Sequence, residues 1–273
     1  MYQKPNQRLK NQTCIVTGGS SGIGAAIAKA IGQEGANVVV NYYSGGDAAT
    51  EIAAEIEASS DCGNAMTFQA DVSKEKDVEA MFAATIEKFG TVDILIANSG
   101  IQKDAPFHEM TLDQWQRVID VNLTGQFLCA RAAVREFLRR GMRPDVSSAL
   151  GKIIHVSSVH EIIPWAGHVN YATAKGGLVM LMQSLAQEYG RKRIRVNSIA
   201  PGAVKTPINE SVWSDPDKFK EMMKLIPYNR IGQPSDIGGV AAWLASDESD
   251  YITGTSIFVD GGMTCYPGFT ENG

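Results

Sequence analysis

The segment TCIVTGGSSGIG, residues 13–24, joins an apolar run to a glycine-rich turn and to the start of an alanine-rich, helix-compatible stretch. The run Cys14–Val16 predicts a short buried strand. A strand, a glycine turn and a helix in this order form the context in which a glycine pattern indicates a dinucleotide site. The spacing T-G-x3-G-x-G therefore predicts a nucleotide-binding turn close to the N-terminus.

The three glycines have different tasks in such a turn. Gly18 allows the chain to turn sharply, Gly22 lets the backbone approach a pyrophosphate, and Gly24 allows helix and strand to pack closely. The N–H groups and the partial positive charge at the helix N-terminus attract the phosphates. The residues between the glycines are expected to contact the cofactor as well: Ser20, Ser21 and Ile23.

Apolar runs and helix-compatible segments alternate along the rest of the chain. Most strand candidates are continuous apolar runs, as expected for a parallel sheet buried on both faces. They cover residues 13–17, 37–42, 65–70, 92–97, 151–157, 194–200 and 255–259. Helical segments lie at 23–34, 47–59, 75–89, 111–140, 169–190 and 234–246. The alternation predicts an α/β fold with one domain over residues 1–273, a Rossmann-type doubly wound parallel sheet of about seven strands with helices on both faces.

A second motif, S-x12-Y-x3-K, runs from Ser158 to Lys175. Tyr171 and Lys175 are four residues apart in a helix-compatible segment, so both side chains project from one face. A neighbouring cation favours the phenolate and lowers the pKa of a tyrosine from its ordinary value near ~10. The pair is therefore a candidate acid/base, and the Ser158 hydroxyl can hydrogen-bond the reacting oxygen. Taken alone, the pair also fits a solvated helix surface.

Together the two motifs resemble the classical short-chain dehydrogenase/reductase family, from Asn11 to the C-terminus. Further landmarks match it in order. Asp71-Val72 resembles the pair that holds adenine, Asn98 and Gly100 lie in a turn resembling N-N-A-G with departures at Ala97 and Ser99, and Asn122 matches the family's catalytic asparagine. The loop over the nicotinamide is matched by Pro201, Gly202, Val204 and Thr206.

The resemblance implies a strand order of 3-2-1-4-5-6-7 and a catalytic tetrad. The tetrad residues are Asn122, Ser158, Tyr171 and Lys175. Tyr171 is expected to exchange the proton, while Lys175 lowers its pKa and binds the nicotinamide ribose together with Tyr171. Asn122 is expected to support a water that links Lys175 to solvent. The resemblance also implies a homotetramer, with 111–140 and 169–190 as interface helices.

Cofactor choice is expected at the end of the second strand candidate, where an acidic residue would bind the ribose 2′-hydroxyl and repel a 2′-phosphate. Tyr42 holds that position, and no acid, Arg or Lys lies near it. Asn41, Ser44 and backbone amides are expected to accept either cofactor, so the sequence predicts the use of NAD or NADP. A packing role for Tyr42 beside the adenine fits equally well.

Local segments around the expected pocket resemble the glucose 1-dehydrogenases within this family. These are SVHEIIPW from Ser158, TPIN from Thr206, and DGGMT from Asp260. A sugar offers many hydroxyls, which polar groups such as His160 and Asn209 can bind. Where those enzymes have a sugar-binding glutamate, Gln102 is present and lacks the charge. The expected substrate residues are Gln102, Ser158, His160, Tyr171, Ile208 and Asn209, whereas Trp165 is expected to pack.

Two other functions fit parts of the pattern. A 3-oxoacyl-carrier-protein reductase needs a basic patch for its acidic carrier, and Arg131, Arg135, Arg139 and Arg140 have helical spacing. A solvated helix face or a subunit interface explains these arginines better. A non-catalytic dinucleotide sensor need not retain catalytic acid/base residues. The presence of all four tetrad residues in this sequence therefore disfavours that class.

Composition and charge narrow the partners and the compartment. The net charge of −5 and the absence of long Lys/Arg runs disfavour nucleic acid, and no apolar stretch reaches the ~18 residues of a membrane helix. Four scattered cysteines and a polar start predict a cytoplasmic protein with reduced thiols, and the four histidines show no metal spacing. We expect residues 141–150 to form an exposed loop. Residues 207–227 are expected to form a substrate lid, and residues 261–273 a C-terminal tail near the pocket.

Overall fold

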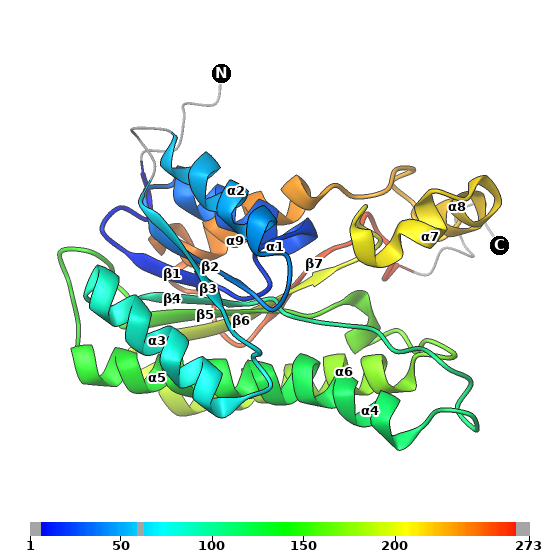
Figure 1. Ribbon diagram of the computed structural model, residues 1–273, viewed down its shortest axis with the longest axis horizontal. Coiled ribbons are helices and arrows are strands. Elements are labelled where there is room, and N and C mark those ends of the chain that lie inside the picture. Colours follow the sequence, from blue (N-terminus) through cyan, green and yellow to red (C-terminus); the bar gives the residue numbers. More distant parts are fainter. Residues whose placement is uncertain (1–6, 59–62, 266–273) are drawn as a thin grey trace.

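A computed structural model, which describes residues 7–58 and 63–265, forms one seven-stranded parallel sheet (Figure 1). The strand order is β3-β2-β1-β4-β5-β6-β7 and all pairs are parallel, as predicted. The strands are β1 (Thr13–Val16), β2 (Asn37–Tyr42), β3 (Ala65–Gln69), β4 (Ile94–Ala97), β5 (Gly151–Val156), β6 (Ile194–Pro201) and β7 (Ser256–Val259). Because β1 and β4 are buried along their whole length, their sequences are mainly apolar rather than alternating. β5 is also buried throughout, although it contains Lys152 and His155.

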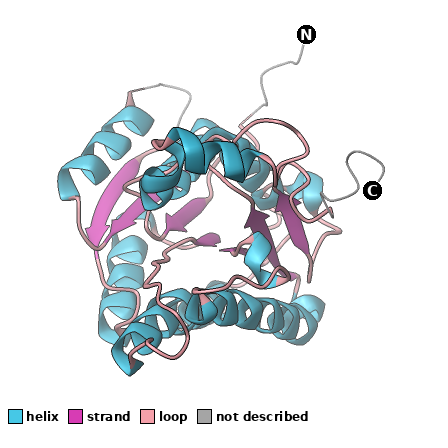
Figure 2. Cartoon of the chain, turned by 90° about the vertical axis from the view of Figure 1, so that its right-hand side faces the viewer, coloured by secondary structure: helices cyan, strands magenta, loops and turns pink. Residues whose placement is uncertain are grey.

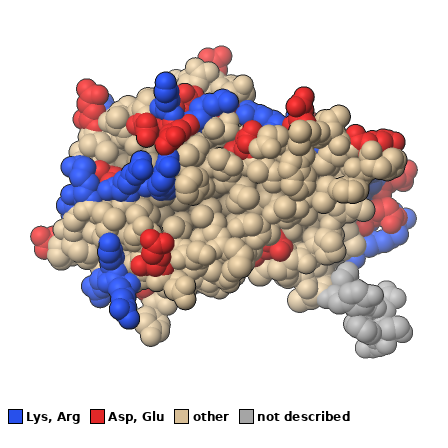
Figure 3. Space-filling view, turned by 90° about the horizontal axis from the view of Figure 1, so that it is seen from below, with Lys and Arg blue, Asp and Glu red and all other residues tan. Residues whose placement is uncertain are grey.

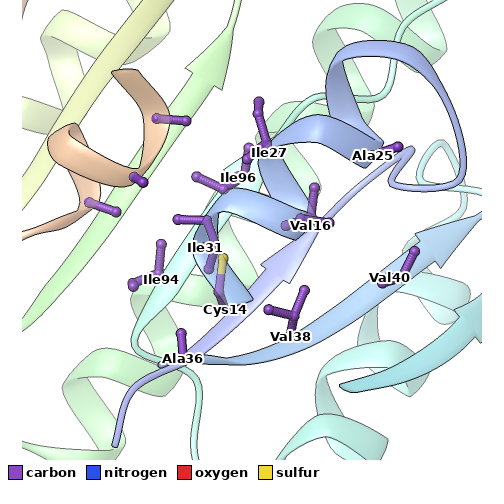
Figure 4. Close-up of a cluster of buried hydrophobic side chains, with 14 of the residues drawn as sticks. Cys14, Val16, Ala25, Ile27, Ile31, Ala36, Val38, Val40, Ile94 and Ile96 are labelled. Atoms are coloured by element: carbon purple, nitrogen blue, oxygen red, sulfur yellow. The ribbon is translucent and has the colours of Figure 1, made fainter. Parts of the chain in front are cut away.

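Helices cover both faces of the sheet, in two layers (Figure 1). One layer contains α1 (Gly22–Gln33), α2 (Gly46–Glu57) and α9 (Pro234–Ala245). The other contains α3 (Glu75–Phe89), α5 (Gly125–Arg140) and α6 (Val169–Tyr189). Figure 4 shows Ile27 and Ile31 of α1 against Cys14, Val16 and Ile96 of the sheet, all with no exposed surface. This packing fixes where α1 begins and so where its free amides point.

The expected helix over 111–140 is interrupted. The structure has α4 (Leu112–Ile119), a π-helical turn (Asp120–Thr124), and then α5. Thr111 caps α4 by accepting a hydrogen bond from the Gln114 amide, and the Gly125 amide donates to the Asp120 carbonyl across the wider turn. Gly125 packs so closely that a Cβ there would lie 2.8 Å from Val72 Cγ2. The sequence pattern could not show this π-turn, which is common at functional sites.

The segment 141–150 is less exposed than predicted. Its second half is buried at Ser147, Ala149 and Leu150. The Ser147 hydroxyl donates to Asp247 at 2.7 Å, and the Ser148 amide donates to the same carboxylate at 2.9 Å. These long-range bonds hold the loop on the amino edge of the sheet, away from the site described below.

At the opposite edge, 207–227 forms three short elements: a 3-10 turn (Pro207–Asn209), α7 (Glu210–Trp213) and α8 (Pro216–Met223). Figure 2 looks onto this end of the molecule, where the strands lie between the two helical layers. Of the predicted tail, residues 261–265 are described and 266–273 lie outside the described residues. In the part of the chain that the structure covers, no helix is long and apolar enough to cross a membrane.

Candidate active site

The glycine turn after β1 has the shape that a pyrophosphate requires. Gly18 and Gly22 have φ of 61° and 52°, which favours glycine. A side chain at Gly24 would place its Cβ 2.0 Å from the Gly18 carbonyl oxygen, so α1 can approach the turn only without one. The Ser21 side chain does not cap α1, which leaves the first amides of the helix available to an anion. These residues fit the phosphates of a dinucleotide.

An open cavity of about 350 Å³ extends from this turn along the carboxyl ends of the strands. It brings together most of the predicted cofactor residues, which come from segments far apart in the sequence. Those on its lining are Gly18, Ser20, Ser21, Gly22, Ile23, Gly24, Asp71, Val72, Asn98, Gly100, Tyr171, Lys175 and Thr206. Four others are not on the lining: Tyr42, Pro201, Gly202 and Val204.

Tyr42, the residue predicted to choose the cofactor, does not line the cavity. Tyr42 packs against the core and over Gly46, whereas Tyr43 and Ser44 line the cavity. Side chains alternate between the two faces of a strand, so the residue after Tyr42 takes the position at the mouth. Asn41 is also unsuited to bind ribose, because it is buried and its amide bonds the Gly18 amide and the Phe68 carbonyl.

Pro201, Gly202 and Val204 lie behind the cavity lining and support it. Pro201 ends β6, and a Cβ on Gly202 would lie 2.8 Å from the Asp260 Cα atom. Val204 forms an isolated parallel bridge with Gly232. They therefore fix the loop that leads to Thr206 without reaching the cavity surface.

Tyr171 lies on the cavity lining in the first turn of α6, next to Ser158. Ser158 follows β5 and its hydroxyl accepts a hydrogen bond from the His160 amide at 3.2 Å. Burial raises the pKa of Tyr171 above its ordinary value, and a hydrogen bond with Ser158 opposes that increase. The Asp104 charge raises the same pKa. Burial thus outweighs the Ser158 hydrogen bond, and the lowering of the Tyr171 pKa by Lys175 stays a prediction.

Lys175 is the buried cation of the site. Its Nζ atom donates to the Val156 carbonyl at 2.8 Å and lies 5.5 Å from the centre of the Tyr171 ring. Burial lowers the pKa of Lys175 to about 8, and the Glu161 charge opposes that decrease. The lysine is thus able to lose or gain a proton near neutral pH.

Asn122 lies in the π-turn and is fully buried. Its Oδ1 accepts from the Ile101 amide at 2.8 Å, and its Nδ2 donates to the Ile101 carbonyl at 2.9 Å. A Cβ on Gly100 would lie 3.6 Å from Asn122 Oδ1 and 3.7 Å from Lys175 Nζ, which places the three groups side by side. The asparagine side chain thus holds the loop that follows β4 in position beside the lysine.

A stack of three rings lies against Tyr171. Trp165 is sandwiched between His160 and His168, with ring centroids 4.1 Å and 3.5 Å apart. Tyr171 meets His160 and Trp165 edge-on, at 6.3 Å and 6.2 Å. Both faces of Trp165 are covered, so it packs and does not offer a platform to a sugar.

Three of the predicted substrate residues have different surroundings. Ile208 lines the cavity and is 55% exposed. Asn209 is committed to the lid, since Oδ1 accepts from Thr206 and Nδ2 donates to the Val204 carbonyl. Gln102 is partly exposed, and within the described residues its side chain has no hydrogen bond. We therefore carry Ile208 and Gln102 forward, and assign Asn209 a structural task.

Several cavity residues were not predicted from the sequence. They are Tyr43, Ala70, Ser99, Ile101, Arg117, Val121, Val156, Ser157 and Pro207. Strand alternation identifies Tyr43, but Arg117 lies in an ordinary helical segment and only the fold brings it to the cavity. No group of three or more His, Cys, Asp or Glu side chains within 7–58 and 63–265 is arranged to hold a metal ion.

Comparison with known proteins identifies the family. A family model described as enoyl-(acyl carrier protein) reductase matches residues 18–264. The chain is 49% identical to 3beta-hydroxysteroid dehydrogenase 1 of Eggerthella lenta over 261 residues, which is 96% of this chain and 97% of that protein. This chain belongs to the short-chain dehydrogenase/reductase family. Glucose 1-dehydrogenase 2 of Bacillus subtilis is 44% identical over 264 residues, with 96% and 98% covered.

Solved structures agree with this membership. A gluconate 5-dehydrogenase of Burkholderia cenocepacia, in complex with NADP and tartrate, has a TM-score of 0.86 and 31% identity over 96% of this chain and 98% of that one. A short-chain type dehydrogenase/reductase of Mycobacterium marinum has a TM-score of 0.86 and 33% identity over 94% and 97%. The predicted family, fold and NAD(P) dependence are confirmed, and the chain is an NAD(P)-dependent oxidoreductase.

Proposed function

We propose that this dehydrogenase oxidises an aldose such as D-glucose at C1 and yields the lactone. The observation that carries this proposal is His160. Its Nδ1 faces the Ile163 carbonyl at 3.0 Å and therefore bears the proton, while burial lowers its pKa and keeps the ring neutral. Nε2 is then a bare acceptor beside Tyr171, suited to a substrate hydroxyl.

The residues divide the chemistry as follows. Tyr171 Oη takes the proton of the reacting hydroxyl, and the Ser158 hydroxyl holds that oxygen in place. Lys175 supplies positive charge next to the phenolate, and Asn122 holds the backbone around the lysine. Bound NAD(P) supplies the hydride acceptor, held at its phosphates by the glycine turn. Thr206, Pro207 and Ile208 line the cavity at the base of 207–227, which supports this segment as the substrate lid.

A second candidate substrate is a hydroxysteroid or similar apolar ring alcohol. The exposed Ile208 side chain and the uncharged Gln102 favour it, and one relative is named for this activity. An apolar ring needs few hydrogen bonds, whereas a site that binds many hydroxyls discriminates through them. The two candidates therefore depend differently on His160.

The test is a turnover assay with D-glucose and with a 3beta-hydroxysteroid, each with NAD and with NADP, following reduced nicotinamide by absorbance. His160→Phe keeps a ring stacked on Trp165 but removes the Nε2 acceptor. We expect kcat/KM for glucose to fall by about 10-fold or more in this variant, as for one lost hydrogen bond in a buried site, with steroid oxidation unchanged. Turnover of the steroid alone by the wild type would exclude the sugar proposal.

The acyl-carrier alternative loses its main support in the structure. Arg131 and Arg135 pair with Glu75 and Glu79, and Arg139 pairs with Glu136. Arg140 pairs with Asp93. The predicted basic patch is therefore neutralised by carboxylates of the same chain and offers little attraction to an acidic carrier.

We infer a homotetramer from the surface of the layer that contains α5 and α6. Figure 3 shows a broad area without charged side chains on this side of the molecule. Phe127, Leu138 and Met180 are 41%, 41% and 60% exposed on these helices. Such a patch marks an interface between proteins. Sedimentation of the purified enzyme should give four times the mass of one chain, and a monomer would overturn this assignment.

A further inference from the structure

Arg117 reaches the cavity from α4, on the side opposite the glycine turn. Its guanidinium donates to Asp71 Oδ2 at 3.3 Å and 3.4 Å and to the Ser73 hydroxyl at 3.0 Å. The guanidinium carbon lies 5.7 Å from the centre of the Tyr43 ring, which comes from the end of β2. The planar cation of Arg117 thus contacts both a carboxylate and an aromatic ring on the lining of the cavity.

The Asp71 carboxylate is fixed by short hydrogen bonds, whereas the Arg117 and Tyr43 side chains are partly exposed. Asp71 Oδ1 accepts from the Ser73 amide at 3.0 Å and from the Ser73 hydroxyl at 2.6 Å. The Arg117 and Tyr43 side chains are exposed by 36% and 64%. A partly exposed ion pair with long contacts contributes little to stability. Arg117 and Tyr43 can therefore rearrange around a ligand at small cost, while Asp71 cannot.

We propose that Arg117 and Tyr43 clasp the adenine base of the cofactor. A guanidinium plane stacks well on an aromatic face. Two planes that enclose a third must be about 7 Å apart, so the exposed Tyr43 ring swings outward when the base enters. Asp71, which is bonded to Arg117 and lines the same cavity, is placed to meet the edge of the base. Arg117 is thus a specificity-determining residue for purine nucleotides.

This arrangement also decides what Arg117 does not recognise. Its charge is balanced by Asp71, and residues 42–45 contain no cation. Among the described residues that line the cavity, the other cation is Lys175, in the catalytic tetrad. Arg117 therefore binds the base that NAD and NADP share, and the 2′-phosphate gains no dedicated partner from it. Both cofactors should depend on Arg117 equally.

Equilibrium binding tests this without turnover. The dissociation constants of AMP, ADP-ribose, NAD, NADP and nicotinamide mononucleotide are measured by calorimetry for the wild type and for Arg117→Ala. We expect about 10-fold weaker binding of the four adenine-containing ligands and unchanged binding of nicotinamide mononucleotide. Tyr43→Ala should act in the same direction and Tyr43→Phe should bind normally.

Arg131→Ala is the matched control, because Arg131 also lies over a ring, Phe127 at 5.2 Å, and pairs with Glu75, outside the cavity. It should leave every constant unchanged. If Arg117→Ala weakens the binding of NADP but not of NAD, Arg117 recognises the 2′-phosphate. If the dissociation constant of every ligand is the same in Arg117→Ala and in the wild type, Arg117 only pairs with Asp71. Either result overturns the proposal. No sugar or steroid is used, so the outcome is independent of the proposed substrate.

Discussion

Two buried lysines lie at opposite ends of β5, and only one of them has a carboxylate partner. Lys152, the second residue of β5, lies at the amino edge of the sheet. It contacts Gln12 Oε1 at 2.7 Å and Asp247 Oδ1 at 3.2 Å. Lys175, beside the other end, donates to the Val156 carbonyl, and within the described residues it has no ion pair. Both are almost fully buried. The same residue type therefore serves two purposes at the two edges of the sheet.

At the amino edge, buried charges are matched by opposite charges. Asp93 accepts from the Thr13 amide at 2.9 Å and pairs with Arg140 and Arg143 at 3.2 Å and 3.1 Å. Asp247 joins Lys152 to the loop at Ser147. Breaking one partner of such a network leaves the other unsatisfied, which is costly.

Burial shifts pKa values at both edges, and at the amino edge Asp247 opposes the decrease at Lys152. At the carboxyl edge, Lys175, Tyr171 and His155 have no ion pair within the described part of the chain. The pKa of Lys175 falls to about 8, that of Tyr171 rises, and that of His155 falls to about 4. Perturbed groups of this kind gather where proton transfer takes place. The comparison teaches that a paired buried lysine stabilises the amino edge, while the unpaired Lys175 is available for proton transfer at the carboxyl edge.

The largest expected effect comes from removing the reactive hydroxyl at the carboxyl edge. Tyr171→Phe should lower kcat by about 1000-fold or more, because the proton of the substrate hydroxyl loses its acceptor. Cofactor binding, measured by calorimetry, should remain within about 3-fold of the wild type. Tyr189→Phe, at the far end of the same helix, is the control and should keep full activity. Near-normal turnover of Tyr171→Phe would mean that another group is the base.

The second effect is a pH dependence that arises from His155. This residue is fully buried on β5, and burial together with the Lys175 charge lowers its pKa to about 4. Between pH 4 and 6.5 the unfolded chain binds more protons than the native state, so the free energy of unfolding falls as the pH decreases through this window. The loss amounts to about 3 kcal/mol over the window.

Replacing His155 by Asn should remove this part of the acid sensitivity, as measured by urea unfolding at a series of pH values. His108→Asn is the matched control, because the His108 side chain is 81% exposed. If the slope between pH 4 and 6.5 is the same in all three proteins, His155 is not the group that titrates.

The smallest effect compares the two lysines directly. Lys152→Met should lower the free energy of unfolding by about 2 kcal/mol, because Asp247 and Gln12 lose their partner. Lys175→Met should lose activity but keep or gain stability at pH 7, since it removes an unpaired buried cation.

The shifted pKa of Lys175 also predicts the direction in which the free energy of unfolding changes with pH. The pKa of Lys175 in the native state, about 8, lies below the ordinary 10.5. Between these values the unfolded chain binds the extra proton, so the free energy of unfolding of the wild type should rise with pH. Chemical unfolding at pH 8 and 10 should show a smaller rise in Lys175→Met. Equal loss of stability in both variants at pH 7 would contradict the contrast between the two edges.

Local patterns predicted the regular elements well, because each strand and helix carries its own signal. The glycine turn, the order of the strands and the positions of Ser158, Tyr171 and Lys175 followed from motifs and from the family that they indicate. The π-turn at Asn122 was missed, since a helix that continues on both sides leaves no gap in the hydrophobic pattern. Tyr43 rather than Tyr42 lines the cavity, because a step of one residue along a strand moves the side chain to the other face of the sheet.

The sequence by itself determined the fold, the cofactor class and the chemistry, since glycines, an apolar alternation and a Tyr-x3-Lys pair are short-range features. Only the tertiary structure decided which of these groups are charged and which are free. Burial sets the pKa of Lys175 and Tyr171, capping removes Asn209 from the substrate residues, and the meeting of α4 with β2 brings Arg117 to the cavity. Desolvation and long-range contacts depend on residues distant in the chain, so no local pattern can contain them.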